Sequence, residues 1–413
     1  MLVLISVLVG VAALFGWASQ RVLRLPNTIG TMLLTAVTSI ALVLLAPQWP
    51  APHHWALGIL GQIDFERLIL HGMLGLLLFA GAFLLDLKAL VHQKLVVALL
   101  AVPATIFSAL AVGGLTWTVA HLFRHPVPLI QCLLFGALIS PTDPVAVLEM
   151  LGRVQAPSHL KAQLAGESLF NDGVGAVLFI SLLEAARGAQ LAPGHVALQI
   201  LLTGGGGILL GICLAFPIAL FMRSVNSASI DILLSLALAL GGYVVAEHLG
   251  LSAPLETVAT ALTLRLLIQN LPDNEIAHHD LSDFWTILDE IQNAILFVLM
   301  GCGFLIVDFR HQGVALGLSE VLIVNLVRIA AVALVLTALR MLRTECRSSL
   351  SVLSWGGLRG GLSIALALSI PHEYTGGWIV TATYVLVVFS ILVQGSTFGI
   401  FLRRTTQPQQ PAI

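Results

Sequence analysis

Acidic and amide side chains interrupt one of the most apolar stretches of this chain, "AGESLFNDGVGAVLFISLL" at 165–183. Glu167, Asn171 and Asp172 lie in its first half. At 100° per residue of an α-helix, these three and Ser168 fall within about 140° of one another, on one face. A carboxylate in hydrocarbon costs about 2.5–3.5 kcal/mol on insertion scales. This face is therefore predicted to look inward, toward a site that uses the charge.

A second polar cluster lies in the preceding apolar run, in "LISPTDPVAVLEM", where Pro141 and Pro144 bracket Thr142 and Asp143. Proline removes a backbone donor and clashes with the preceding turn, so this pair should open the helix. Asp143 is then placed to cap the half-helix that follows, as well as to bind an ion. Oxygen ligands without a His or Cys cluster favour a hard monovalent cation over a transition metal. The predicted ligands are the carboxylates of Asp143 and Asp172, the hydroxyl of Ser168 and the backbone near Thr142.

A third cluster is "SWGGLRGGLSIAL", in which four glycines, at 356, 357, 360 and 361, surround Arg359. Broken backbone at membrane depth is tolerated only where protein or a watery cavity satisfies it. A buried arginine needs a counter-charge, and we expect Glu167 to supply it in a structural ion pair. Two other arginines within apolar runs, Arg265 and Arg328, are interpreted as snorkelling or paired residues.

The composition indicates a protein that spans a membrane many times. Of 413 residues, 58% are hydrophobic and 10% charged, against about 25% charged in ordinary soluble domains. A net charge of −2 gives no reason to expect nucleic acid as a partner. The four cysteines are scattered without ligand or disulfide spacing. The run Gly204–Gly207 lacks the lysine of a phosphate loop, so these glycines are expected to pack helices. We expect an all-α, multi-pass protein of the plasma (inner) membrane, without a cofactor and not an enzyme.

Apolar runs of about 20 residues divide the chain into transmembrane helices. The first run has no basic region before it and is interpreted as a retained helix rather than a signal peptide. The acidic segment 270–283 is predicted to be a solvated loop, with pH sensing through its histidines as the alternative. The 13 predicted spans are 2–19, 27–46, 66–85, 94–121, 127–151, 162–185, 196–222, 229–247, 251–268, 283–305, 316–340, 349–370 and 376–402.

Basic residues give the orientation, because cytoplasmic loops are enriched in Lys and Arg. With the N-terminus outside, only Arg67, Arg124, Arg187 and Arg310 fall in outer connections. The inner connections and ends hold Arg21, Arg24, Lys88, Lys94, Arg153, Lys161, Arg223, Arg340, Arg343, Arg347, Arg403 and Arg404. This segregation predicts an N-out, C-in topology.

The interrupted helices occupy corresponding places, since each is the fifth of a set of six. Corresponding breaks in two halves indicate an inverted-repeat transporter with its site at the midplane. The predicted first repeat spans 1–195 and the second 229–405. A linking helix, 196–228, inverts the second repeat, and a short cytoplasmic tail follows at 406–413. The discontinuous helices 5 and 12 are expected to cross.

Four motifs together resemble those of the NhaP-type sodium/proton antiporters, relatives of the animal sodium/proton exchangers. They are "SPTDPVAV", "GESLFNDGVGAVLF", "FWTILDEIQNAILFVLMG" and "WGGLRGGLSIALAL", in this order over nearly the whole chain. The resemblance implies an NhaA-like antiporter fold of 13 helices and a homodimer. It also implies a moving core of helices 4–6 and 11–13, and a dimerisation domain of helices 1–3 and 8–10.

The resemblance also implies roles for single residues. Asp172 matches the aspartate that binds the proton and the cation in turn, with Asn171 as its partner. Asp143, Thr142 and Ser168 match positions that complete the alkali-cation site. Glu167 and Arg359 match a structural ion pair. In "LLLFAGAFLLDLKAL" Ala80 stands where the family often has a glutamate, which removes one carboxylate from the expected surroundings of the ion.

The expected function is exchange of Na⁺, and also Li⁺, for H⁺ by alternating access, electroneutral at one ion for one, in sodium and pH homeostasis. A K⁺/H⁺ antiporter and a proton-coupled organic-anion carrier remain as alternatives. An anion carrier would need more cationic groups at the site. A channel would need rings of carbonyls or charges around a pore, which these motifs do not form.

Overall fold

The computed structural model describes residues 2–25, 27–62, 64, 66–123, 127–153, 156–188, 193–225, 227–269, 275–305, 311–341, 349–371, 377–399 and 402. Within these ranges all regular structure is helical and no strand occurs. Nine of the helical segments are long and apolar enough to cross a membrane by length and composition. The multi-span, all-helical class predicted from the composition is therefore confirmed. The predicted tail at 406–413 lies outside the described residues.

The first half of the chain contains α1 (Leu2–Ala18), η1 (Ser19–Leu23), α2 (Asn27–Leu45), α3 (Pro50–Leu60), η2 (Glu66–Met73), α4 (Leu74–Phe83), α5 (Leu87–Ala101), α6 (Pro103–Leu122), α7 (Leu129–Ile139), α8 (Val145–Arg153) and α9 (Ser158–Ala186). The second half contains α10 (Pro193–Ser224), α11 (Ala228–His248), α12 (Ala253–Ile268), α13 (Glu275–Cys302), η3 (Gly303–Leu305), α14 (His311–Met341), α15 (Leu350–Trp355), α16 (Gly361–Ser369), α18 (Trp378–Phe389) and η4 (Ser390–Gly395).

Both predicted helix breaks are present. The segment between α7 and α8 is non-helical from Ser140 to Pro144, and that between α15 and α16 is non-helical from Gly356 to Gly360. The prolines act at the first break, where they remove backbone donors and exclude the helical turn before them. At the second break glycine replaces side chains that would favour helix. Both openings therefore follow from local sequence.

Three predicted boundaries are wrong. The segment 94–121 belongs to a 36-residue helical stretch, Leu87–Leu122, in which Pro103 separates α5 from α6. The proline-rich connection before the third span contains α3, which has proline at its first turn, where the missing N–H costs nothing. The expected loop 270–283 is helical from Glu275 onward, as the first turns of α13. Exposed His279 and Asp283 form an i,i+4 ion pair there at 3.2 Å.

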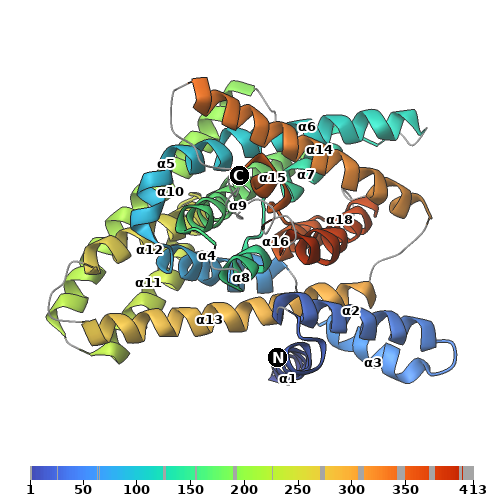
Figure 1. The fold of residues 1–413 in the computed structure, drawn as a ribbon, viewed down its shortest axis with the longest axis horizontal. Helices are drawn as coiled ribbons and strands as arrows, with labels where there is room; N and C mark the ends of the chain where they lie inside the picture. Colours follow the sequence, from blue (N-terminus) through green and yellow to red (C-terminus); the bar gives the residue numbers. More distant parts are fainter. Residues whose placement is uncertain are drawn as a thin grey trace, which may run out of the picture.

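The long helix α9 lies in the middle of the molecule, and α13 crosses the molecule between α9 and the first helices, α1 to α3 (Figure 1). Helix α9 packs against α5, α7, α12 and α4, while α13 packs against α2, α4 and α16. Large apolar side chains also point outward, among them Leu201, Leu209 and Leu220 on α10 and Leu322 and Leu326 on α14. An apolar outer surface over fully hydrogen-bonded helices is the solution that a bilayer requires.

Candidate functional site

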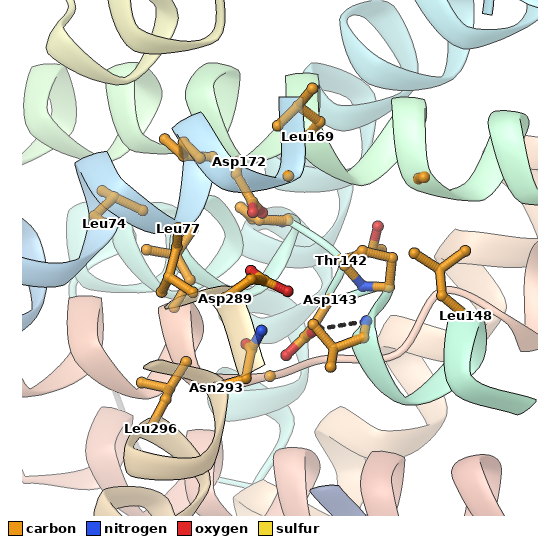
Figure 2. Close-up of a pocket in the computed structure, with 18 of the residues that line it drawn as sticks. Leu74, Leu77, Thr142, Asp143, Leu148, Leu169, Asp172, Asp289, Asn293 and Leu296 are labelled. Carbon is orange, nitrogen blue, oxygen red and sulfur yellow. Dashed lines mark hydrogen bonds between the residues drawn. The ribbon is translucent and has the colours of Figure 1, made fainter. Parts of the chain in front are cut away.

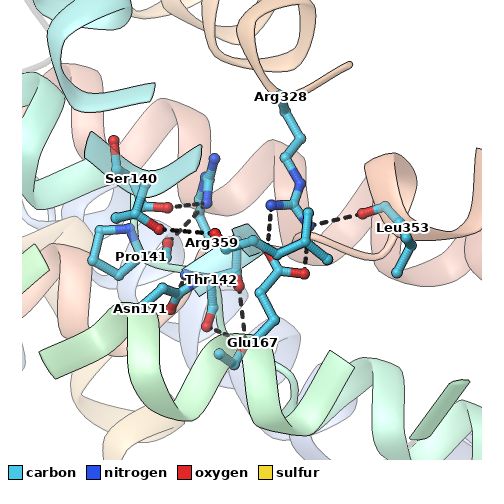
Figure 3. Close-up of polar contacts among 11 residues, drawn as sticks. Ser140, Pro141, Thr142, Glu167, Asn171, Arg328, Leu353 and Arg359 are labelled. Atoms are coloured by element: carbon cyan, nitrogen blue, oxygen red, sulfur yellow. Dashed lines mark hydrogen bonds and ion pairs between the residues drawn. The ribbon is translucent and has the colours of Figure 1, made fainter. Parts of the chain in front are cut away.

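The two helix breaks meet directly at the centre of the molecule. The backbone N–H of Asp143 donates to the Leu358 carbonyl at 2.8 Å. From the other break, Arg359 Nη1 donates to the carbonyls of Ser140 at 2.7 Å and Pro141 at 2.9 Å (Figure 3). The Arg359 guanidinium thus binds the carbonyls that α7 leaves without helical partners at its end. Helices 5 and 12 of the predicted topology therefore touch at their unwound segments.

Each break is also held by a polar side chain from the element that comes after the broken helix, α9 in the first half and η4 in the second. The Thr142 N–H donates to Asn171 Oδ1 of α9 at 3.2 Å. In the second half, the Arg359 N–H donates to Ser390 Oγ of η4 at 2.8 Å. In both halves, a backbone N–H that the interrupted helix leaves without a helical acceptor thus donates to a side-chain oxygen.

Thr142, Ser168 and Asn171 form a closed hydrogen-bond network behind the first break. Asn171 Nδ2 donates to Thr142 Oγ1 at 2.8 Å, and Ser168 Oγ donates to the Thr142 carbonyl at 2.5 Å. The two hydroxyls of Thr142 and Ser168 are 2.9 Å apart. Three of the predicted cation ligands therefore lie together, but in this conformation their oxygens bind one another.

The predicted ion pair between Glu167 and Arg359 is wrong. The buried carboxylate of Glu167 pairs with both terminal nitrogens of Arg328 on α14, with Nη2–Oε2 at 3.0 Å (Figure 3). Arg328 Nη2 also donates to the Leu353 carbonyl at 2.8 Å. Arg359 instead extends to the end of α7, and no ion pair joins it to Glu167 among the residues that the structure describes. The prediction chose the wrong arginine because Arg328 reaches Glu167 from α14, whereas Arg359 lies on the unwound segment and reaches the end of α7.

Space for Arg328 is provided by the second break. A Cβ added at Gly357 would come within 2.6 Å of Arg328 Nε. Any larger residue at 357 would push the guanidinium away from Glu167, so the glycine is needed here for close approach.

Asp143 and Asp172 line a cavity of about 160 Å³ beside the crossing (Figure 2). Asp143 Oδ1 accepts from the Val145 N–H at 2.9 Å, which is the predicted cap of the following half-helix. Asp172 takes part in no hydrogen bond or ion pair with any residue in the described ranges, although it lies near the charges of Asp143 and Arg359. Asp172 is therefore the carboxylate at the crossing that has no hydrogen-bond or ion-pair partner within the described ranges.

The opposite wall of the cavity consists of α4 and α13. Helix α4 contributes apolar residues, and Ala80 is fully buried without lining the cavity. Helix α13 contributes the polar pair Asp289 and Asn293, one turn apart (Figure 2). Sequence reasoning missed both as site residues. Their i,i+4 spacing on one face of the "FWTILDEIQNAILFVLMG" motif is the signal that could have indicated them.

Comparisons with known proteins agree with this arrangement. Residues 9–404 match the family model "Sodium/hydrogen exchanger, transmembrane". The chain is 36% identical to the Na⁺/H⁺ antiporter NhaP of Pseudomonas aeruginosa, covering 98% of this chain and 97% of that protein. It is 30% identical to the Na⁺/H⁺ antiporter NhaH of Halobacillus dabanensis over 82% of this chain and 83% of that one. The solved structure of the sodium proton antiporter MjNhaP1 of Methanocaldococcus jannaschii superposes with a TM-score of 0.74 at 18% identity, covering 97% of each chain.

Proposed function

Because the chain belongs to the sodium/hydrogen exchanger family, we propose that it exchanges Na⁺ for H⁺ by alternating access, with Asp172 carrying either ion. The observation that carries this proposal is the position of Asp172 on the cavity at the helix crossing, without a bonding partner in the part of the chain that the structure describes. A charge inside the membrane without a partner is costly and is retained where it has a function. Asp143, Thr142, Ser168 and Asn171 are proposed to complete the alkali-cation site after the Thr142–Ser168 hydrogen bonds rearrange.

The charges around the crossing support electroneutral exchange. The Glu167–Arg328 pair is neutral as a unit. Asp143 and Arg359 both lie near Asp172 at the crossing, and their opposite formal charges sum to zero. Asp172 is then neutral when it holds one proton or one sodium ion, and Asn171 beside it cannot carry a second proton. The moving site would therefore cross the membrane with the same charge in both directions.

The finer topology is part of the same proposal. It has thirteen spans in an N-out, C-in orientation, which agrees with the segregation of basic residues. It has two inverted repeats, 1–195 and 229–405, around the linking helix 196–228. The matching contacts of Asn171 and Ser390 with the two breaks support the repeat relation. Spans 4–6 and 11–13 would move as a core against a dimerisation domain of spans 1–3 and 8–10. A homodimer in the plasma membrane, serving sodium and pH homeostasis without a cofactor, completes the proposal.

The alternatives are less well supported. The relatives reported above carry sodium in their names, which favours Na⁺ over K⁺. An organic-anion carrier would need a cationic group free to meet its substrate. Arg359 Nη1 is occupied by two carbonyls, and the charged side chains that line the cavity within the described ranges are all acidic.

Reconstituted transport tests the proposed function. Liposomes that contain the protein and a pH-sensitive dye are expected to release internal protons when sodium or lithium is added outside. Potassium is expected to give a much weaker response. No response to any alkali cation, or a response to an organic anion instead, would contradict the proposal.

The same liposomes test the stoichiometry. Potassium and valinomycin clamp the membrane potential, and sodium is the substrate. The rate of sodium-dependent proton movement should stay constant across applied potentials, because one-for-one exchange moves no net charge. Empty liposomes under the same clamp control for proton leak. Rates that rise steeply with voltage would contradict one-for-one exchange.

A further inference from the structure

Helix α13 places a carboxylate on the cavity wall that faces Asp172. Asp289 and Asn293 line the cavity together with Asp143 and Asp172, and Figure 2 shows these side chains around a common space. The rest of this wall, from α4 and α13, consists of Leu74, Leu77, Leu78, Gly81, Leu85 and Leu296. Asp289 is thus the charged group of this wall, and Asn293 is its other polar residue.

Asp289 lies on α13, which extends from Glu275 to Cys302, within the cytoplasmic third of the predicted span 283–305. A carboxylate at such a depth is costly, and most are kept because they pair or because they line an ion path. Asp289 lies one turn before Asn293 on the same face of the helix, and it lies near the charge of Asp143. No lysine, arginine or histidine of the described residues forms an ion pair with it. Helix packing therefore leaves its charge unbalanced, and the cavity in front of it is where a cation would balance it.

The helix that carries Asp289 differs from the helices that carry the crossing. Asp143 and Asp172 lie on the segments α7–α8 and α9, whereas α13 packs mainly against α2 and α4, with a smaller contact to α16. In the proposed division into domains, α13 belongs to the dimerisation domain and the crossing to the moving core. Asp289 would then face Asp172 only while the core lies as it does here.

The cavity also extends toward one face of the membrane. It reaches Leu85, just beyond the end of α4, and Leu148 in α8. In the proposed topology these residues lie toward the cytoplasm. A cation entering from that side would meet Asp289 on the way to Asp172, and one entering from the other side would not.

We propose that Asp289, with Asn293 beside it on the cavity wall, is a capture residue that receives the alkali cation on the cavity side and transfers it to Asp172 without itself crossing the membrane. This inference rests on the proposed function, because it presupposes that Asp172 carries the cation. It gives Asp289 a role in sodium affinity on one face only. Since its charge stays with α13, it adds nothing to the charge that moves with the core, in keeping with one-for-one exchange.

The test is to measure the apparent KM for sodium separately on each face, in everted and right-side-out vesicles, for the wild type and Asp289→Asn. We expect the apparent KM to rise roughly fivefold or more on the cytoplasmic face, which corresponds to losing about 1 kcal/mol of charge interaction. The KM on the other face should stay within error of the wild type, as should the maximal rate. Asp289→Glu should retain most of the affinity.

Asp283→Asn is the matched control, because it makes the same substitution on the same helix at an exposed position that does not line the cavity. An equal change of KM on both faces, no change on either face, or the same change in Asp283→Asn would overturn the capture role. A merely structural role of Asp289 would lower the rate or the amount of folded protein and would not distinguish the two faces. The proposed function is tested separately by sodium-dependent proton movement in the wild type and its loss in Asp172→Asn.

Discussion

Asp172→Asn is expected to reduce sodium-dependent proton movement to the level of empty liposomes. The amide is close in size to the carboxylate but carries no charge and releases no proton, so neither ion can occupy the site. The measurement is dye-reported proton flux in liposomes that contain equal amounts of wild-type or variant protein.

The same variant should remain folded. Asp172 makes no hydrogen bond or ion pair within the described residues, so the substitution removes no native hydrogen bond or ion pair. Thermal unfolding of the purified protein is therefore expected to be unchanged or slightly raised. Asp283→Asn, an exposed aspartate on α13, serves as the control for reconstitution and should transport normally. A folded Asp172→Asn protein that still exchanged at the wild-type rate would show that another group carries the ions.

Arg328→Gln is expected to lower the free energy of unfolding by about 3–5 kcal/mol, because it leaves the Glu167 carboxylate buried without its partner. Glu167 is 1% exposed, so water cannot replace the guanidinium. Thermal unfolding of the solubilised protein measures the loss. Arg67→Gln is the matched control. It breaks the exposed ion pair between Arg67 and Asp64, which should cost less than about 1 kcal/mol.

A double-mutant cycle distinguishes the two possible partners of Glu167. Coupling between Glu167→Gln and Arg328→Gln should be large, since the groups touch, whereas coupling between Glu167→Gln and Arg359→Gln should be small. Arg359→Gln alone should cost about 1–3 kcal/mol, because it leaves the Ser140 and Pro141 carbonyls without a donor. Strong coupling of Glu167 with Arg359 and none with Arg328 would contradict the pairing.

Features set by local sequence were predictable. The breaks at Pro141 and Pro144 and at Gly356–Gly361 depend on proline and glycine, which act on their own backbone. The shared face of Glu167 and Asp172 follows from helical periodicity alone. The cap at Asp143 follows from its place at the start of α8. In each case the deciding interactions lie within a few residues of one another.

Features set by contacts distant in sequence were not predictable in the same way. Glu167 had two arginines within reach, and choosing Arg328 over Arg359 required knowing where α14 passes the crossing. Asp289 was hidden because its partner across the cavity, Asp172, lies more than a hundred residues earlier in the chain. The helical turns of α13 before Asp283 were misjudged because their polar composition resembles a loop, although the long helix that follows extends them.

Linkage between sodium and proton binding tests most directly whether one carboxylate serves both ions. Sodium is titrated into the purified protein in buffers of different ionisation enthalpy, and calorimetry gives the number of protons released per sodium bound. At the acidic end of the working range this number should approach one in the wild type. In the same range, apparent sodium affinity should fall tenfold for each unit by which the pH is lowered. The number should be near one in Asp283→Asn as well, whereas Asp172→Asn should release no proton when sodium is added. Sodium binding to the wild type without proton release, at an affinity that does not change with pH, would contradict a shared site at Asp172.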